Sequence, residues 1–362
     1  ASANAETPDH LIIDRYISWE ILRPFYGGVG MLILVFIGYS AAKQLGLAAE
    51  GQMGMSDAFA LIGLNALIAL EVLLPSALFF SILAAIGRRY RDGEMLALYA
   101  TGVSPARILE SVAKLSLVIA LITGFVSIAA RPWAYRESYR IEAEAAARFD
   151  LGKMASGRFV TLDNVNFTFI ADGLDLKQGL HKRVFMQRNF QGERRRSEII
   201  VAEAAALLEL NPGQTDTAKF FNGYYYLLDN VKKQDASLRF KELAITAPFG
   251  EAQAKYRRKA ESTSDLAASR HPKDVAEFQW RISTPVTTLL LALTAVPLAR
   301  SRPRESRFRI FIAAMALYVG VFSLAAMART WVEQDTIGSV PGLWSIHLVL
   351  ALVLLALVKL RV

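Results

Sequence analysis

Six apolar runs constrain this chain most strongly, because about 20 apolar residues in a helix match the ~30 Å hydrocarbon core of a membrane. Three runs lie in the first part of the chain and three near its end, and a charged middle separates them. The expected spans cover residues 25–47, 59–86, 115–130, 282–299, 310–327 and 343–358. The sequence therefore predicts an α-helical membrane protein with six transmembrane helices, interrupted by one soluble domain.

The middle of the chain predicts strands. Short runs rich in aromatic and β-branched residues alternate with the turn signals DG, QGE, NPGQ and KKQD. The candidates are RFVTL, NFTFIAD, KRVFMQRNF, SEIIVAEAAALLEL, KFFNGYYYLLDNV and SLRFKELAITA. The part VAEAAALLEL suits a helix equally by propensity, and its neighbours favour a strand. This spacing indicates a β-sandwich or jelly roll between the third and fourth spans. Its inward-facing aromatic residues would line an open hydrophobic interior or fill a closed core. We expect them at Phe167, Phe169, Tyr224 and Tyr226.

These patterns divide the chain into three segments. Residues 11–132 hold the first three spans and a surface helix at about 92–102. Residues 133–278 hold the β-jelly-roll domain with its linkers, which are a juxtamembrane helix at 133–150 and a polar return at 251–273. Residues 279–362 hold the last three spans.

Charge predicts the topology. The chain has 41 Lys+Arg against 33 Asp+Glu, and the loop 299–309 alone carries five arginines. Arginines in short loops beside apolar runs mark the cytoplasmic side and disfavour a nucleic-acid role. We therefore expect both termini in the cytoplasm and the β domain outside, which in a bacterium means a multi-pass inner-membrane protein with a periplasmic domain. The first ten residues have no apolar core of a secretory signal.

The stretch 87–105 sits between two spans and is too polar to cross a membrane. Asp92 is a candidate N-cap of a short helix, and Gly102 can close that helix in the left-handed conformation. Ser104 and Pro105 then suit the N-cap and first turn of the next helix.

The short helix itself has two interpretations. Glu94 suits its positive N-terminal end, and Met95, Leu98 and Tyr99 form an apolar ridge beside Arg91. The stretch is either a positively charged loop that sets topology or a docking helix for a cytoplasmic partner.

Glu71 lies inside the second span, together with Pro75. A carboxylate at that depth is costly and is a candidate functional group. The structural alternatives are that Glu71 is protonated or pairs with Lys43, near the outer end of the first span.

The residues give no support for catalysis by this chain. It has no cysteine, and its four histidines show no metal-ligand spacing. The sequence GKMASGRF, from Gly152, has the outline of a P-loop but carries Arg158 and Phe159 where Lys and Ser/Thr must bind phosphate and Mg²⁺. We expect no catalytic residue, no metal site and no cofactor bound by this chain.

Two blocks resemble a known family. The surface stretch, with Gly87, Tyr90, Glu94, Gly102 and Ser104, resembles the coupling-helix region of the YjgP/YjgQ family, the lipopolysaccharide-transport permeases. The block FQWRISTPVTTLLLALTAVPLARSRPRESR resembles the fourth span and following loop of the LptF branch more than the LptG branch. The resemblance runs from about residue 11 to the C-terminus.

The resemblance implies the permease subunit of an ABC exporter that extracts lipopolysaccharide from the inner membrane and passes it to a periplasmic β-jelly-roll bridge toward the outer membrane. Its implied partners are an LptG-like permease, an LptB-like ATPase dimer that holds ATP and Mg²⁺, and LptC-like and LptA-like jelly-roll proteins. Coupling to the ATPase would use Arg91, Glu94, Met95, Leu98 and Tyr99. The lipid would meet Lys43 at its phosphates and the apolar wall of Leu32, Phe36, Ile312 and Met315.

Two positions depart from that family's pattern. Glu71 stands where an uncharged polar residue is expected, and Ser306 replaces the glycine usual after the fourth span. The alternatives are a membrane-anchored sensor or assembly scaffold, or an ABC subunit that transmits force without moving lipid. An intramembrane enzyme using Glu71 is disfavoured, because no second catalytic group is evident.

Overall fold

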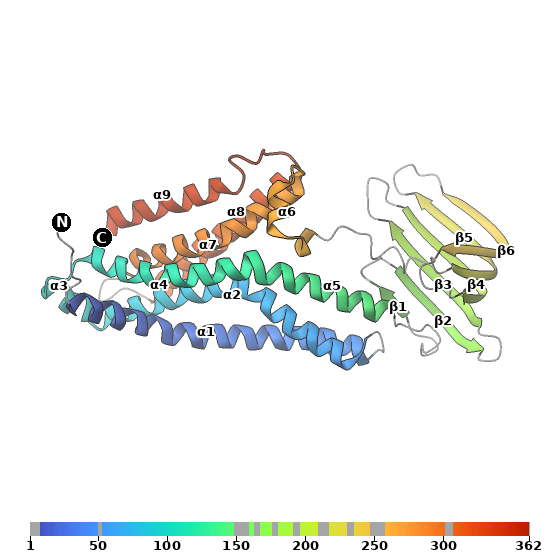
Figure 1. The fold of residues 1–362 in the computed structure, drawn as a ribbon, viewed down its shortest axis with the longest axis horizontal. Coiled ribbons are helices and arrows are strands. Elements are labelled where there is room, and N and C mark those ends of the chain that lie inside the picture. The colour runs from blue at the N-terminus through green and yellow to red at the C-terminus, as the bar shows by residue number, and fades with distance from the viewer. Residues whose placement is uncertain are drawn as a thin grey trace. The chain divides into compact units, whose positions relative to one another are not determined.

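A computed structural model describes residues 8–49, 53–147, 159–162, 167–175, 180–190, 196–208, 217–229, 235–246, 258–300 and 307–361. These residues separate into a helical unit and a β unit (Figure 1). The helical unit comprises the described parts of 1–46, 58–139 and 257–362, and the β unit those of 47–57 and 140–256. Residues 133–139 and 258–278, expected in the β segment, therefore belong with the helices.

Helical residues cover the expected spans almost completely, and five of the six spans are matched by a helix long enough to cross a membrane. The helices are α1 (Pro8–Ala49), α2 (Met55–Arg91), α3 (Glu94–Ala100), α4 (Pro105–Phe125), α5 (Arg131–Ala147), α6 (Thr263–Ala268), α7 (Pro272–Ala299), α8 (Arg307–Glu333) and α9 (Trp344–Arg361). A π-helical turn, Val126–Ala130, joins α4 to α5 without a break. Five helices in the described chain are long and apolar enough to cross a membrane, and the apolar part of α9, Trp344–Leu360, is shorter.

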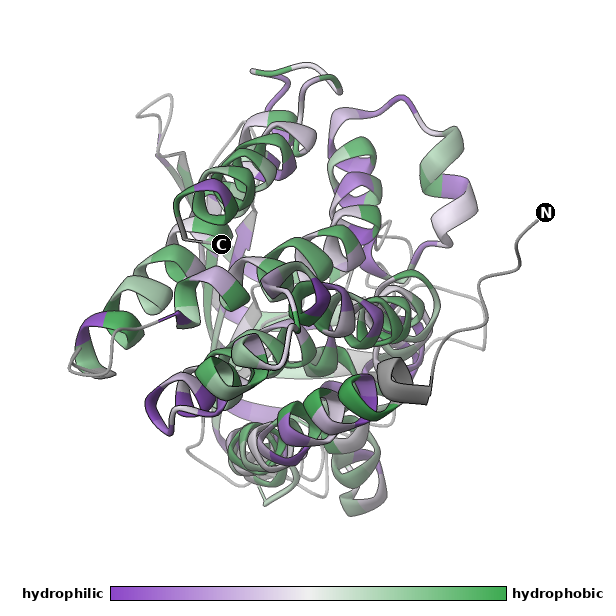
Figure 2. Ribbon diagram, turned by 90° about the vertical axis from the view of Figure 1, so that its left-hand side faces the viewer, coloured by the Kyte–Doolittle hydropathy of each residue, from purple (hydrophilic) through white to green (hydrophobic). Residues whose placement is uncertain are grey.

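The centre of the helical unit is α7. Of the most apolar 18-residue window in each helix, 61% is buried in α7 but only 11% in α1 and α8. Figure 2, which views the long helices nearly end-on, shows them largely hydrophobic around their circumference. A helix that is apolar all round must be covered by protein or by lipid. The uncovered apolar surfaces of α1 and α8 are therefore surfaces for lipid or for another membrane subunit.

The six expected strands are confirmed, including the ambiguous VAEAAALLEL segment. They are β1 (Phe159–Leu162), β2 (Phe167–Asp175), β3 (Leu180–Phe190), β4 (Arg196–Leu208), β5 (Thr217–Asp229) and β6 (Ala236–Thr246). They pair antiparallel in sequence order to make one sheet (Figure 1). The two-sheet arrangement expected for a sandwich is thus not found among the described strands.

The spacing of the buried residues changes part-way along the strands. On β4 the buried residues are Ile200 and Ala202 and then Ala205, so a step of three replaces the usual step of two. The neighbouring strands have left-handed residues at this level, Arg183 with φ 49° on β3 and Asn222 with φ 48° on β5. The pairing register is the same on both sides of this level, so the strands switch faces together.

This switch corrects one expectation. Alternation from Phe220, which is buried, would place Tyr224 and Tyr226 inward as well, but Asn222 reverses the faces between them. Tyr224 and Tyr226 are instead exposed, with their ring centroids 6.3 Å apart. Phe169 does face inward, at 3% exposure, and the side chain of Phe167 lies outside the described part of the structure.

The expected polar return is partly structured. A 3₁₀ turn, Arg258–Ala260, is followed by α6, whose N-cap Ser262 accepts a hydrogen bond from the backbone N–H of Asp265. Leu266 is buried against the helical unit. Residues 251–257 of the expected linker lie outside the described residues.

Candidate functional site

The local sequence around α3 makes a tight corner between α2 and α4. Gly93, with φ 79°, is the N-cap, and its carbonyl accepts the Ala97 N–H at 3.1 Å. Asp92 is therefore not the cap that we expected, and its carboxylate lies 3.4 Å from Nε of Arg88. Gly102 does close the corner in the left-handed conformation, with φ 92°, as predicted.

The start of α4 also follows the prediction. The Ser104 hydroxyl accepts the N–H of Arg107 at 3.2 Å, and Pro105 is the first helical residue. Local chemistry therefore fixes both ends of the corner.

The apolar ridge of α3 faces the bundle. Met95 is 1% exposed, and Leu98 and Tyr99 are half-buried against the same core. The Tyr99 hydroxyl lies 2.6 Å from that of Tyr90. Met95 was expected to couple to the ATPase, but its side chain is buried in this chain, because a short amphipathic helix on a bundle buries its ridge against that bundle. The outward apolar residue is Leu96, 60% exposed.

Glu94 belongs to a charged cluster at this corner. The hydroxyl of Tyr16 donates to its Oε2 at 2.8 Å, and Nη1 of Arg89 donates to the same oxygen. Arg89 also pairs with Glu20 and stacks over the Tyr16 ring, 5.0 Å from its centroid. The hydrogen bonds from Arg89 and then Tyr16 lower the pKa of Glu94. The Glu94 side chain is 42% exposed, so the cluster holds an ionised, accessible carboxylate. Arg91, which was also expected to couple to the ATPase, is the last residue of α2, and its side chain is half-buried.

A second group of charges is buried within the helices. Nε of Arg131 lies 3.0 Å from Oε2 of Glu71, and both side chains are about 5% exposed. The hydroxyl of Ser127 donates to Oε1 of Glu71 at 2.6 Å. Ser127 belongs to the π-helical turn and Arg131 follows it directly, so this turn brings both groups onto one carboxylate. Short π-helical turns of this kind often lie at functional positions.

Glu277, on α7, connects this pair to two further arginines. Its Oε1 accepts from Nη1 of Arg131 at 2.9 Å and from Nε of Arg281 at 3.2 Å. Its Oε2 accepts from Nη2 of Arg329 at 2.8 Å, and Arg329 in turn pairs with Glu333. Glu277 and Arg281 are fully buried. Three arginines and three glutamates thus compensate one another across α2, α5, α7 and α8, which a buried charge requires.

This network answers the question about Glu71. The suggested pairing with Lys43 is wrong, because the partner of Glu71 is Arg131 and Lys43 is exposed on α1.

Three consecutive residues of α7 fasten three different segments. Gln279 donates to the Ser339 carbonyl at 2.6 Å and accepts the Leu343 N–H at 3.1 Å. The ring of Trp280 packs under the Arg329 guanidinium, 5.2 Å from its centroid. Arg281 donates to Thr263 and to backbone carbonyls of the turn before α6. The motif Gln279-Trp280-Arg281 is therefore an anchor of the helical unit.

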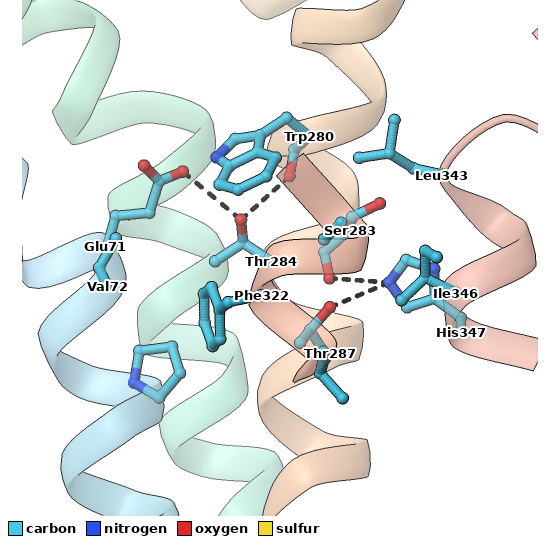
Figure 3. Close-up of a pocket in the computed structure, with 13 residues that line it drawn as sticks. Glu71, Val72, Trp280, Ser283, Thr284, Thr287, Phe322, Leu343, Ile346 and His347 are labelled. Carbon is cyan, nitrogen blue, oxygen red and sulfur yellow. Dashed lines mark hydrogen bonds between the residues drawn. The ribbon is translucent and has the colours of Figure 1, made fainter. Parts of the chain in front are cut away.

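A pocket lies beside the network, between α2, α7, α8 and α9 (Figure 3). It encloses about 490 Å³, including its open mouth. Its walls are mostly apolar, with polar groups from α7 and α9 and the Glu71 carboxylate at one side. The lining residues are Glu71, Val72, Pro75, Trp280, Ser283, Thr284, Thr287, Val321, Phe322, Ala325, Leu343, Ile346 and His347.

The residues expected to meet lipid lie on the outer helices. Leu32, Ile312 and Met315 are 38–50% exposed and Phe36 is half-buried. Leu32 and Phe36 belong to α1, and Ile312 and Met315 belong to α8. Within the described residues, no group of three His, Cys, Asp or Glu side chains is placed to hold a metal ion.

Comparison with known proteins decides the family. The model of the family described as "Lipopolysaccharide export system permease LptF/LptG" matches residues 15–360. The chain belongs to this family. Its similarity to the LptF protein of Escherichia coli K12 is 26% identity over 350 residues, which covers 94% of this chain and 92% of that protein. The LptF protein of Shigella flexneri gives the same values. The expected membership of the lipopolysaccharide-transport permeases is confirmed.

As a member of the LptF/LptG family, the chain is a multi-pass permease subunit with a separate antiparallel sheet. The buried network was the feature that sequence reasoning missed. No role was predicted for Arg131 or Glu277 from the sequence. The available signal was the density of charge flanking the third, fourth and fifth spans, at Arg131, Glu277, Arg281 and Arg329.

Proposed function

We propose that this chain is the LptF-like half of an ABC exporter that extracts lipopolysaccharide from the inner membrane. The observation that carries the proposal is the family match over nearly the whole chain. Its partners are an LptG-like permease, an LptB-like ATPase dimer that hydrolyses ATP, and LptC-like and LptA-like jelly-roll proteins. This chain carries out no chemistry of its own.

The α3 corner is the docking point for the ATPase. Glu94 presents its carboxylate to an arginine of that partner, and the exposed Leu96 supplies the apolar contact. All the Glu94 contacts described above use Oε2, which supports a role for Oε1 toward a partner. Because Met95 anchors α3 to the bundle core, a push on α3 moves α2 and α4 with it.

The outer surfaces of α1 and α8 face the partner permease, with lipid between them. Leu32, Phe36, Ile312 and Met315 offer apolar side chains to acyl chains, and Lys43 attracts lipid A phosphates near the membrane surface. The low burial of α1 and α8 supports this assignment.

In this proposal, α3, the start of α1 and the end of α9 lie in the cytoplasm. The end of α9 and the start of α1 lie at the same end of the helical unit as α3 (Figure 1), which is consistent with six spans. The β unit is then periplasmic. We assign it as a half-open jelly roll whose apolar face, including Phe169, Phe220 and Phe240, passes acyl chains toward the bridge.

The test is purification of the chain from its native membrane in mild detergent, followed by mass spectrometry of proteins and lipids. A cytoplasmic ATPase, a second permease and lipid A species in the same complex are expected. ATP-dependent release of lipopolysaccharide from vesicles containing that complex is the functional readout. Isolation of the chain alone and without lipid in repeated preparations would contradict the proposal.

A further inference from the structure

The start of α1 belongs to the same corner as α3, although the chain does not join the two helices directly. Tyr16 and Glu94 are 78 residues apart, and the Tyr16 hydroxyl donates to Oε2 of Glu94 at 2.8 Å. The same hydroxyl accepts a hydrogen bond from Nη1 of Arg89, and the Tyr16 ring lies against the Arg89 guanidinium. Tyr16 therefore occupies a fixed position between the end of α2 and the start of α3.

Asp14 fixes the same segment of α1 on α4. Its carboxylate accepts hydrogen bonds from Nη2 of Arg107 at 2.9 Å, from Nζ of Lys114 at 3.1 Å and from the hydroxyl of Ser111. The Asp14 side chain is 20% exposed, so these bonds are partly shielded from water. Hydrogen bonds between charged groups are stronger than those between neutral groups. The first turns of α1 are thus tied to α2, α3 and α4 together.

Burial supports the same attachment. Ile17 is 2% exposed and Ile21 is 0% exposed, and both pack in the core that holds Met95 of α3. Farther along α1, Met31 and Leu34 are 69% and 70% exposed. The segment 14–21 is therefore the anchored part of α1, whereas the apolar part that follows is largely uncovered.

The position of Tyr16 directs one oxygen of Glu94 toward a partner. Arg89 and Tyr16 both donate to Oε2, and the contacts of Glu94 with the described residues leave Oε1 as an acceptor. Tyr16 carries no charge, so it holds the carboxylate in place without neutralising it. We infer that Tyr16 is a positioning residue for ATPase docking, and that the docked ATPase is energetically linked to α1 through it. The inference rests on the proposed docking of the ATPase at α3.

Such a link acts in both directions. If the bond from Tyr16 to Glu94 strengthens ATPase binding by a given factor, bound ATPase must stabilise that bond by the same factor. The bond joins α1 to α3, so bound ATPase should also hold the start of α1 more firmly on the corner. The apolar surface of α1, which we assign to lipid and the partner permease, follows directly after this anchored segment.

The variant Tyr16→Phe tests the positioning role, because it removes the hydroxyl and keeps the ring against Arg89. The dissociation constant of the ATPase is measured on the full chain and its partner permease in phospholipid nanodiscs. It should rise about threefold to tenfold, as expected for the loss of one hydrogen bond. The control Tyr26→Phe, at a side chain 65% exposed on the same helix, should leave the dissociation constant unchanged.

A second background separates positioning from general damage to the structure. In a chain that carries Glu94→Ala, the Tyr16 hydroxyl has lost its acceptor, so Tyr16→Phe should change the dissociation constant by less than about twofold. An equal loss of affinity in both backgrounds would show a general effect on folding and would overturn the inference. An unchanged dissociation constant for Tyr16→Phe alone would overturn it as well.

Amide hydrogen exchange measures the link to α1. Saturating ATPase should slow exchange at residues 14–21 of the wild-type chain by about the same factor, and should not slow it in Tyr16→Phe. Equal slowing in both chains would show that the ATPase covers α1 directly, which contradicts a link through Tyr16. If the wild-type chain binds no ATPase, the proposed function itself fails. If it binds the ATPase and Tyr16→Phe binds equally well, only this inference fails.

Discussion

Arg131 and Glu71 form an ion pair, with 3.0 Å between Nε and Oε2, at a place where both side chains are almost completely buried. The pair joins α2 to the start of α5, and Glu277 extends it to α7 and α8. An isolated charge in this position would be very costly, so each member depends on the others.

The first prediction is that Glu71 is energetically coupled to Arg131 and not to Lys43. A double-mutant cycle of Glu71→Gln with Arg131→Gln should give a coupling energy of about 1–3 kcal/mol. In the matched cycle of Glu71→Gln with Lys43→Gln, the two effects should add within about 0.5 kcal/mol, because Lys43 is exposed on α1 and is not paired with Glu71. Thermal unfolding in detergent gives both values. A larger coupling to Lys43 would contradict the observed pair.

The second prediction concerns Glu277, which compensates three arginines. Glu277→Gln should lower the free energy of unfolding by about 3–5 kcal/mol, because it leaves the buried guanidinium group of Arg281 without a counter-charge. The control Glu110→Gln removes a carboxylate that is 53% exposed and paired with Arg107 and Lys114, and should cost about 0–1 kcal/mol. Equal effects of the two variants would mean that the network contributes little to stability.

The third prediction concerns coupling to the ATPase. Arg89→Gln should weaken ATPase binding in the same direction as Glu94→Ala, because Arg89 orients the Glu94 carboxylate. A charge-assisted hydrogen bond is worth about 1.5–3 kcal/mol, so the expected loss in affinity is tenfold or more. Arg88→Gln, at a side chain 72% exposed, is the control. The readout is the amount of ATPase that copurifies with each variant, compared at equal membrane insertion. Full retention of the ATPase by both Arg89→Gln and Glu94→Ala would refute the assignment.

The fourth prediction concerns Gly223 in β5. A Cβ atom there would lie 2.8 Å from Cζ of Phe240 and closer still to the Val201 carbonyl oxygen, so the sheet must shift to admit it. Gly223→Ala should destabilise the β unit by roughly 1–3 kcal/mol, the usual cost of overpacking. Faster amide hydrogen exchange in β4 and β5 is the measurement. The control Gly320→Ala adds a Cβ atom where nothing lies within 4 Å, so it should leave this exchange unchanged. Unchanged exchange in Gly223→Ala would contradict the close approach of β4 and Phe240 to this glycine.

The fifth prediction concerns Tyr225. Burial, and then the neighbouring Glu198 carboxylate, raise the pKa of Tyr225 to about 12 from an ordinary value of 10.0. The folded chain therefore keeps this proton at a pH where the unfolded chain has lost it. The resulting stabilisation is complete below pH 10 and is lost as the pH rises toward 12. The tyrosinate absorbance of the wild-type chain minus that of Tyr225→Phe should titrate near pH 12. A midpoint near 10 would contradict the buried environment.

Local sequence determined much of the fold. Apolar runs located the membrane helices, and turn signals located all six strands, because these patterns act over a few neighbouring residues. Gly102 and Ser104 fixed the ends around α3 for the same reason. Asp92 failed as a cap because Gly93 takes the left-handed turn one residue later.

Tertiary structure determined which charged side chains pair and which faces of the helices and strands are buried. Arg131 and Glu277 are 146 residues apart, so no local pattern could pair them, and the partner of Glu71 was misidentified. Met95 turned inward because the bundle offered α3 an apolar surface, and Tyr224 turned outward because left-handed residues on β3 and β5 switch the sheet's faces. The sequence by itself determined where helices and strands form, since those depend on neighbouring residues. Only packing between distant segments decided which side chains meet, since burial lets a charge persist only beside its partner.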